Sequence, residues 1–302
     1  MGIEKNFSNS LIERVDDANK ILKKYLPSEE GYASRVAEAI NYSATSPGKR
    51  LRPILMKETY KMYGGKNQLI EPFMAAIEMI HNYSLVHDDL PAMDNDEYRR
   101  GRKTTHAVYG AGMATLAGDG LLNLAFETAL SAVYLAPDKA SVIIKATRIL
   151  GEKAGIHGML GGQAADVDAE DRHRKIDENE LQFIHENKTA ALLEASLMIG
   201  AVLAEASDEE VKKLEEIGKA VGVAFQIRDD ILDVTGDEKI LGKHVGSDAE
   251  NQKSTYVTLH GLEKSQIDVE TLSEKAIGLM SSLSKKNMFL DELIEYLIDR
   301  VK

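Results

Sequence analysis

The chain has 302 residues, of which 43% are hydrophobic, and it carries a net charge of -12 at pH 7 with no cysteine. This length can bury a large core, and the negative charge argues against nucleic acid as a partner, because phosphates require a basic surface. The absence of cysteine excludes disulfides and thiolate metal sites and favours an intracellular, cytoplasmic protein. The most apolar stretch, residues 115–136, is interrupted by Asp119, Asn123 and Glu127, so we expect no stable membrane insertion.

Helical periodicity runs through almost the whole chain, which has only six prolines and no alternating run that is typical of a strand. We therefore predict an all-α fold that forms a single domain over residues 1–302. Breaks are expected at residues 63–67, 137–138, 161–162 and 236–254, which are rich in Gly, Pro or Asp. Ser207 and Glu210 form a capping box that predicts a helix to about Val234, and an earlier helix is expected from about Asp177 to Glu205.

A basic segment lies at the first loop-to-helix junction. It contains Gly48, Lys49, Arg50 and Arg52, followed by Pro53. Arg offers a planar fork of donors and Lys a movable point charge, so together they suit a diphosphate that is bound without metal. A basic surface patch is the alternative interpretation.

An aspartate cluster ends one of the following helices and consists of Asp88, Asp89 and Asp94. An ideal helix repeats its facing after 18 residues, so Asp88 is predicted to lie in line with Ile70. The helix thus begins as core and ends by directing carboxylates toward the interior.

Polar residues close to this cluster extend the candidate site. His81 and Ser84 lie on the same helix side as Asp88, so His81 either donates to a phosphate or bonds to a backbone carbonyl in the core. Arg99 and Arg100 follow the cluster directly and could bind phosphate or form a second surface patch.

A second aspartate cluster ends the helix that begins after Ser207, and it consists of Asp229, Asp230 and Asp233. Asp229 is predicted to point where Val211 points, on the apolar stripe. Gln226 precedes Asp230 by one turn and adds a further oxygen. Three lysines are candidate phosphate ligands: Lys188 on the helix from Asp177, and Lys243 and Lys253 in the Gly-rich loop.

Acidic pairs usually form a solvated face or a helix cap, and one such cluster alone is weak evidence for a site. Two clusters on the apolar side of long helices need a cation, because burying unpaired carboxylates costs several kcal/mol each by rough estimate. Carboxylates suit Mg²⁺, which takes one or two of them per ion and completes its shell with water and phosphate oxygens. We therefore expect the two clusters to share a diphosphate through metal ions. His87 and Asp88 also suggest a metal-dependent phosphohydrolase of the His-Asp class. That class needs several metal-binding histidines, and the other histidines of this chain show no spacing that supports it.

Taken together, the motifs resemble the short-chain trans-isoprenyl diphosphate synthases, and most closely the bacterial farnesyl diphosphate synthases. The resemblance is carried, in chain order, by residues 47–53, 79–94, 99–101, 116–119, 161–163, 188–189, 225–233, 242–243 and 253–256. It implies one large helical bundle around a central substrate cavity, the isoprenoid synthase fold, and a homodimer. It also implies head-to-tail transfer of a prenyl group to isopentenyl diphosphate.

The resemblance also implies roles for individual residues. Asp88, Asp94 and Asp229 would hold three Mg²⁺ ions around the allylic diphosphate, with Asp89 and Asp230 as further catalytic members of the two clusters. The allylic diphosphate clamp would be completed by Arg99, Lys188, Lys243 and Lys253. The diphosphate of isopentenyl diphosphate would be bound by Gly48, Lys49, Arg52, His81 and Arg100. Thr189 and Gln226 would face the developing carbocation.

The length of the product should depend on the depth of the cavity below the first cluster. The family resemblance places a floor at Tyr83, with Ser84 beside it, and favours farnesyl diphosphate. The helical wheel puts Tyr83 about 140° away from Asp88, so a core position or a contact with a partner subunit is the alternative. A geranylgeranyl diphosphate synthase, a terpene cyclase and a non-catalytic regulatory subunit are the alternatives for the whole protein. A cyclase usually carries an Asn, Ser and Glu metal motif that is absent here, and a regulatory subunit could have lost the aspartates that are intact here.

Overall fold

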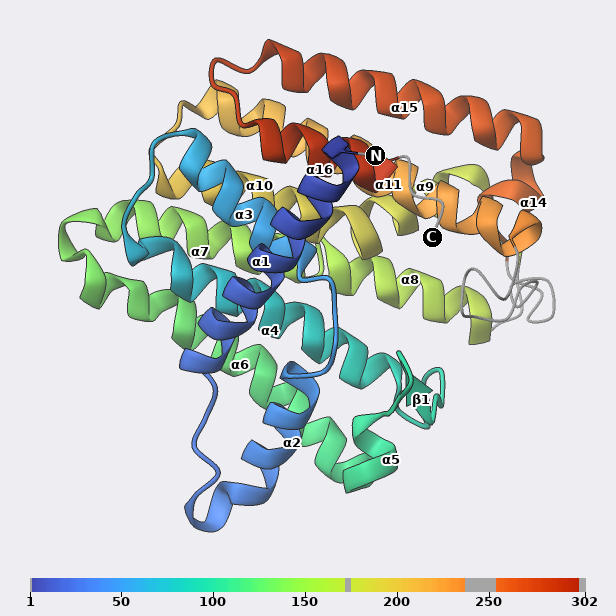
Figure 1. The fold of residues 1–302 in the computed structure, drawn as a ribbon. Helices are drawn as coiled ribbons and strands as arrows, with labels where there is room; N and C mark the ends of the chain where they lie inside the picture. Colours follow the sequence, from blue (N-terminus) through green and yellow to red (C-terminus); the bar gives the residue numbers. More distant parts are fainter. Residues whose placement is uncertain (1, 172–174, 237–253, 299–302) are drawn as a thin grey trace. The chain divides into compact units, whose positions relative to one another are not determined.

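The structure is a computed structural model that describes residues 2–171, 175–236 and 254–298. It divides into two compact units, Met1–Arg148 with Val202–Glu205 and Ile149–Ala201 with Ala206–Lys302. Helices make up most of the described part of each unit (Figure 1). The predicted all-α class is therefore confirmed, whereas the single domain and the central cavity stay predictions.

Helices of the first unit follow one another with short connections. In chain order they are α1 (Gly2–Lys24), η1 (Gly31–Ala33), α2 (Ser34–Ala44), α3 (Leu51–Met62), η2 (Gln68–Ile70), α4 (Glu71–Asp88), α5 (Thr105–Tyr109), α6 (Ala111–Leu135), η3 (Pro137–Lys139) and α7 (Ala140–Ala154), of which the last also enters the second unit. The breaks predicted at 63–67 and 137–138 are confirmed, since they separate α3 from η2 and α6 from α7.

The core of the first unit is built around α4. Every residue of this helix from Pro72 to Ile80 is buried, and α6 packs along it (Figure 1). The buried face of α6 is made of small residues such as Ala114, Ala117 and Ala125, which allow close approach of the two helix backbones. α4 is therefore fixed on nearly all sides, and this holds the first aspartate cluster at its carboxyl end in place.

The second unit contains the remaining helices. They are α8 (Met159–Asp171), α9 (Glu178–Ile184), η4 (His185–Ala190), α10 (Ala191–Leu203), α11 (Asp208–Thr235), α14 (Tyr256–His260), α15 (Leu262–Ser282) and α16 (Met288–Ile298). α11 packs its apolar face, which includes Leu214, Ile217 and Ala224, against α15, α16 and η4. Ser207 is its N-cap, and the side-chain oxygen accepts a hydrogen bond from the Glu210 amide at 3.3 Å. The predicted start and end of this helix are confirmed.

Two strands contradict the expectation that no segment is extended. β1 (Tyr98–Arg99) and β2 (Arg102–Lys103) form an antiparallel hairpin in which Arg99 pairs with Arg102. The two turn residues, Arg100 and Gly101, have φ angles of 54° and 75°, as a type I′ turn requires. The sequence signal was weak, because Arg occupies the turn position where Asn, Asp or Gly is usual.

Two helix boundaries also differ from the prediction. Residues 161–162 lie inside α8 and do not break it; a side chain at Gly162 would collide with the Lys188 backbone, so this glycine permits close packing of α8 on η4. The helix predicted from Asp177 to Glu205 is interrupted by η4, a π-helical segment. Hydrophobic periodicity cannot reveal such a segment, because it inserts a residue without removing the helix.

No helix in the described part of the chain is long and apolar enough to span a bilayer.

Candidate active site

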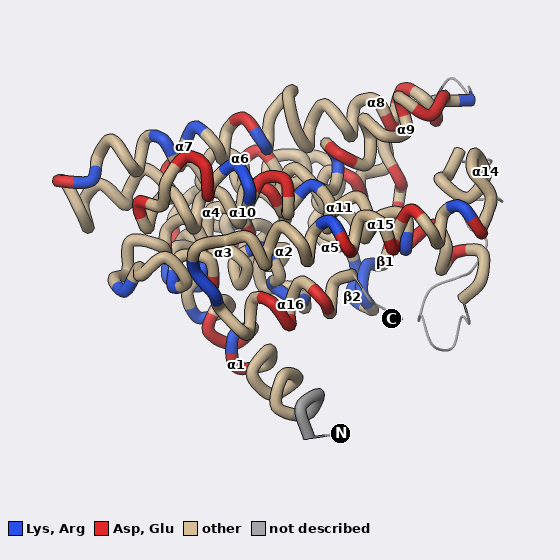
Figure 2. Tube along the Cα trace, turned by 90° about the horizontal axis from the view of Figure 1, so that it is seen from above, with Lys and Arg blue, Asp and Glu red and all other residues tan. Residues whose placement is uncertain are grey.

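A group of cationic side chains lies in the first unit where the loop before α3 meets the hairpin. Figure 2 shows Lys and Arg in blue along the hairpin of β1 and β2. Arg100 donates from Nη1 to the Pro47 carbonyl at 2.9 Å, and a Cβ on Gly48 would lie only 2.6 Å from the same nitrogen. Arg52 lies in the first turn of α3, and His81 faces it from α4. The structure therefore brings together Gly48, Arg52, His81 and Arg100, as predicted, while Lys49 is exposed beside them.

The electrostatics of this group show an excess of positive charge. Burial, and then the nearby guanidinium groups of Arg52, Arg100, Arg50 and Arg99, hold the pKa of His81 well below its usual range, so its imidazole is neutral at pH 7. Burial lowers the pKa of Arg52 to about 10, with Glu78 opposing and Arg100 adding to that effect. The buried Nε of Arg52 finds no hydrogen-bond partner among the described residues. An arrangement of this kind favours a polyanion.

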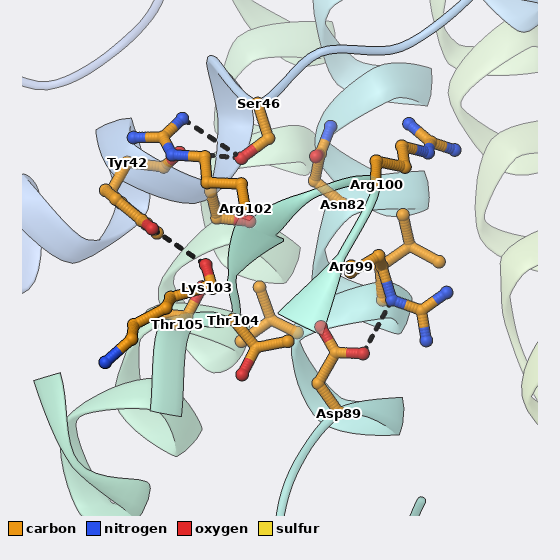
Figure 3. Close-up of a pocket in the computed structure, with 13 residues that line it drawn as sticks. Tyr42, Ser46, Asn82, Asp89, Arg99, Arg100, Arg102, Lys103, Thr104 and Thr105 are labelled. Carbon is orange, nitrogen blue, oxygen red and sulfur yellow. Dashed lines mark hydrogen bonds and ion pairs between the residues drawn. The ribbon is translucent and has the colours of Figure 1, made fainter. Parts of the chain in front are cut away.

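The first aspartate cluster has one buried member and two that are more accessible. Asp89, only 5% exposed, accepts a hydrogen bond from Arg99 Nε at 2.6 Å (Figure 3). Burial raises the pKa of Asp89, although Arg99 opposes this effect. Asp88 is half-buried and Asp94 exposed, and the Asp94 amide donates to the Asp88 carbonyl at 2.9 Å, which folds the loop back over the helix end.

The hairpin covers a pocket beside α2 and α4. In Figure 3, Arg99 and Arg100 extend to one side of the hairpin and Arg102 to the other. Arg102 lies over the ring of Tyr42, with its central carbon 3.6 Å from the ring centroid, and the Tyr42 hydroxyl donates to the Lys103 carbonyl at 2.7 Å. These contacts fix the hairpin and hence the two arginines beside the aspartate cluster.

The second cluster lies at the carboxyl end of α11, and its second member is again the buried one. Asp230 is 5% exposed and accepts from the backbone amide of Tyr256 at 2.8 Å and from Gln226 Nε2 at 3.4 Å. Gln226 in turn accepts from the Thr189 hydroxyl at 2.9 Å. The predicted neighbours Thr189, Gln226 and Asp230 therefore form one hydrogen-bonded chain, whereas Asp229 is half-buried.

The burial of Asp89 and Asp230 corrects the helical-wheel prediction that Asp88 and Asp229 are the residues that point inward. In both clusters the residue that follows lies deeper, Asp89 beneath Arg99 and Asp230 beneath the Tyr256 backbone. The prediction was wrong because later segments of the chain cover the ends of the two helices. The pattern of a single helix holds no information about such contacts.

Lys188 belongs to a second pocket, in the second unit. Its ammonium lies 2.5 Å from the carboxylate of Asp166 on α8. Together with Thr189, Gln226, Asp230 and Thr255 they line a pocket of about 100 Å³. Sequence reasoning missed Asp166, although it stands one helical turn after Gly162 and so shares the α8 face that meets η4.

The predicted chain-length residues lie within the first unit. Tyr83 is 6% exposed and its ring meets His87 edge-on, with centroids 5.9 Å apart. Burial, and then the charge of Asp88, raise the pKa of Tyr83 to about 12. Ser84 is half-buried and donates to the His81 carbonyl at 2.9 Å. Lys243 and Lys253 lie outside the described residues.

The donors suit a hard divalent cation. Asp88, Asp94 and Asp229 offer only oxygen, and the described residues contain no group of three acidic, His or Cys side chains that could enclose an ion. Mg²⁺ does not need such a cage, because water and substrate phosphate complete its shell. The residues therefore fit Mg²⁺ that arrives with a diphosphate.

Comparisons with known proteins identify the family. The family model described as Polyprenyl synthetase matches residues 33–295. A farnesyl diphosphate synthase of Micrococcus luteus is 43% identical over 282 residues, covering 93% of this chain and 94% of that protein. A geranylgeranyl diphosphate synthase of Cyanophora paradoxa is 38% identical over 295 residues, covering 98% and 97%. The crystal structure of a Helicobacter pylori geranyltransferase with magnesium and isoprenyl diphosphate superposes with a TM-score of 0.81 at 32% identity, covering 96% of each chain.

The chain belongs to the polyprenyl synthetase family. It is a short-chain prenyl diphosphate synthase, an enzyme that transfers prenyl groups in isoprenoid biosynthesis. Relatives with different products lie at similar identity, so the family assignment alone leaves the chain length of the product open.

Proposed function

We propose that this enzyme condenses isopentenyl diphosphate with dimethylallyl and then geranyl diphosphate to release farnesyl diphosphate and inorganic diphosphate. The observation that carries the proposal is the electropositive group of Arg52, His81 and Arg100, where the guanidinium groups outnumber the nearby carboxylate of Glu78, as the diphosphate of isopentenyl diphosphate requires. The 43% identity to a farnesyl diphosphate synthase supports the farnesyl product. A geranylgeranyl product is the second candidate, supported by the relative at 38% identity.

The allylic diphosphate is assigned to the aspartate clusters, with Asp88, Asp94 and Asp229 as ligands of three Mg²⁺ ions. Bound Mg²⁺ neutralises the diphosphate and makes it a better leaving group. Asp89 orients Arg99, and Asp166 orients Lys188, so that each cation is held for the departing diphosphate. Lys243 and Lys253 are proposed to complete this clamp.

The allylic carbon-oxygen bond then breaks, and the double bond of isopentenyl diphosphate attacks the resulting cation. The Thr189 hydroxyl donates a hydrogen bond to the Gln226 side-chain oxygen, which leaves the hydroxyl lone pairs free to face the cation and stabilise it electrostatically. The released diphosphate accepts the final proton, so the chain needs no separate base. An apolar cavity excludes water, which would otherwise convert the cation to an alcohol.

The product itself provides the first test. Purified protein with Mg²⁺, isopentenyl diphosphate and dimethylallyl diphosphate is expected to give mainly farnesyl diphosphate by chromatography of the dephosphorylated products. Tyr83→Ala, which removes the proposed floor below Asp88, is expected to shift the main product to geranylgeranyl or longer chains.

The matched control is Tyr32→Ala, since Tyr32 is fully exposed and its loss should leave the product unchanged. A wild-type enzyme that makes mainly longer chains, or a folded Tyr83 variant with an unaltered product, would remove the floor assignment.

A homodimer is proposed from α6 and α7. While the alanines of α6 are buried against α4, its other side exposes Leu130, Tyr134 and Leu135, and α7 exposes Ile144 nearby in sequence. Exposed large apolar side chains that lie close together are usually covered by a partner, and a second copy can cover them symmetrically. Sedimentation equilibrium of the unmutated protein is expected to give twice the chain mass. The double variant Leu130→Glu with Tyr134→Lys is expected to give the mass of a monomer. A monomeric wild-type protein would refute the assignment.

The predicted cytoplasmic location stays a prediction.

A further inference from the structure

The side chain of Arg50 joins four segments of the first unit. It is 5% exposed, and its Nε donates to Asn19 on α1 at 2.8 Å. Nη1 donates to Glu78 on α4 at 2.6 Å, while Nη2 donates to the carbonyls of Ala44 and Ser46 at 3.0 and 2.6 Å. Four hydrogen bonds thus tie the end of α2 and the loop of residues 45–50 to α1 and α4.

The backbone of Arg50 is held in an unfavourable conformation. Its φ of 48° and ψ of 35° lie in the left-handed region, which residues with a Cβ seldom adopt. Such a conformation persists where surrounding contacts determine it, and it is often found next to functional sites. At Arg50 this conformation changes the direction of the chain sharply. Gly48, before the change of direction, lies beside Arg100, and Arg52, after it, lies in the first turn of α3.

Packing does not replace these hydrogen bonds. A pocket of about 290 Å³ lies between α1 and the loop, lined by Asp16, Lys20, Lys23, Pro47 and Arg50 among others. The side of the loop that faces α1 therefore has little apolar support. On this side the Arg50 guanidinium holds the loop, whereas Arg100 and Arg102 bond to Pro47 and Ser46 from the hairpin.

Glu78 is the acidic partner in this arrangement. It is 3% exposed, and its charge also acts on Arg52 and Arg100. A buried carboxylate inside a cationic group can do two things with opposite effects on anion binding. It can weaken binding by cancelling positive charge, or it can strengthen binding by fixing Arg50 and hence the loop.

We propose that Glu78 and Arg50 are positioning residues for the isopentenyl diphosphate site, because their buried ion pair sets the turn that places Gly48 and Arg52 around the diphosphate. This inference rests on the proposed assignment of Arg52, His81 and Arg100 to that substrate. It adds two residues that do not touch the substrate and whose effect passes through the loop.

The test uses Glu78→Gln and Glu78→Asp in the full chain, with steady-state kinetics for each substrate. Positioning predicts that Glu78→Gln raises the KM for isopentenyl diphosphate about tenfold or more, while the KM for the allylic diphosphate stays within about twofold. Glu78→Asp, which keeps the charge, should recover part of the loss. A lower KM in Glu78→Gln would show that charge cancellation dominates and would overturn the proposal, as would an unchanged KM.

Two controls separate positioning from general stability. Glu58 is also 3% exposed and accepts from Arg14 at 3.0 Å, so Glu58→Gln should lower thermal stability comparably without changing either KM. The double variant Arg50→Met with Glu78→Leu removes both charges, and such apolar replacements of buried ion pairs are often neutral or stabilising. It should recover thermal stability and still show the raised KM for isopentenyl diphosphate. Recovery of both would mean that the pair acts on stability alone.

Binding of isopentenyl diphosphate to the unmutated and Arg52→Met proteins, measured by calorimetry, separates this inference from the proposed function. If Arg52→Met binds as tightly as the unmutated protein, the site assignment fails. If Arg52→Met loses binding and Glu78→Gln behaves like Glu58→Gln, only the positioning inference fails.

Discussion

Asp88→Ala and Asp229→Ala are each expected to lower turnover by about two to four orders of magnitude, equivalent to about 3 to 5 kcal/mol of transition-state stabilisation. The physical reason is that each carboxylate is proposed to hold Mg²⁺ against the leaving diphosphate, an interaction that strengthens as the bond breaks. Both side chains are half-buried at helix ends, so their truncation should leave the fold intact. Rates at saturating substrates, together with circular dichroism, check both parts.

Two exposed acids serve as controls, one nearby in the chain and one on the same helix. Glu97→Ala, next to the hairpin, and Glu209→Ala, in the first turn of α11, should keep turnover within about twofold. Near-normal activity in either aspartate variant would eliminate the proposed metal-assisted ionisation. Excess Mg²⁺ should partly restore the activity of the variants if the ions bind more weakly but in the same place.

Arg52→Met is expected to raise the KM for isopentenyl diphosphate about a hundredfold while raising thermal stability or leaving it unchanged. Loss of a desolvated charge-assisted contact to phosphate costs about 2 to 5 kcal/mol. The folded-state pKa of Arg52 is lowered to about 10 by burial, so the charged form is disfavoured by folding at every pH below that value. Its replacement therefore removes a destabilising charge at neutral pH. Kinetics and thermal denaturation at pH 7 give the two readouts.

Lys57→Met is the control on the same helix, since Lys57 pairs with Asp17 at 2.6 Å, away from the cationic group. It should leave the KM for both substrates unchanged. An unaltered KM in Arg52→Met would mean that this guanidinium binds no diphosphate. A large loss of thermal stability would instead mean that Arg52 has a partner in the folded protein, such as an anion retained during purification.

Local patterns allowed much of the fold to be predicted. Ser207 as N-cap and the apolar stripe of α11 are properties of one helix, and they gave its start and its end. The hairpin of residues 98–103 depends on two left-handed turn residues, and nothing in an Arg-Gly pair requires them. Gly162 was interpreted as a break because its role, the close approach of η4, involves residues that are distant in the sequence.

The candidate site divides in the same way. Residues carried by the family resemblance, such as Thr189 and Gln226, do lie in contact. Partners that arise from other elements were missed: Asp166 beside Lys188, Glu78 beside Arg50 and the Tyr256 backbone over Asp230. These contacts are tertiary, and a helical wheel cannot place them. The roles of the site residues stay predictions until the variants are measured.

The π-helical segment η4 amounts to a one-residue insertion into a helix that would otherwise run from α9 into α10. Each residue of an α-helix turns the chain by about 100°, so the insertion puts the apolar faces of the two flanking helices out of phase. Deleting one residue from 185–190 would restore a regular helix with better internal hydrogen bonding. It would also rotate Lys188 away from Asp166, or Thr189 away from Gln226. An irregularity that weakens the helix is thus the feature that lets one short segment present an ammonium and a hydroxyl to two neighbouring helices at once.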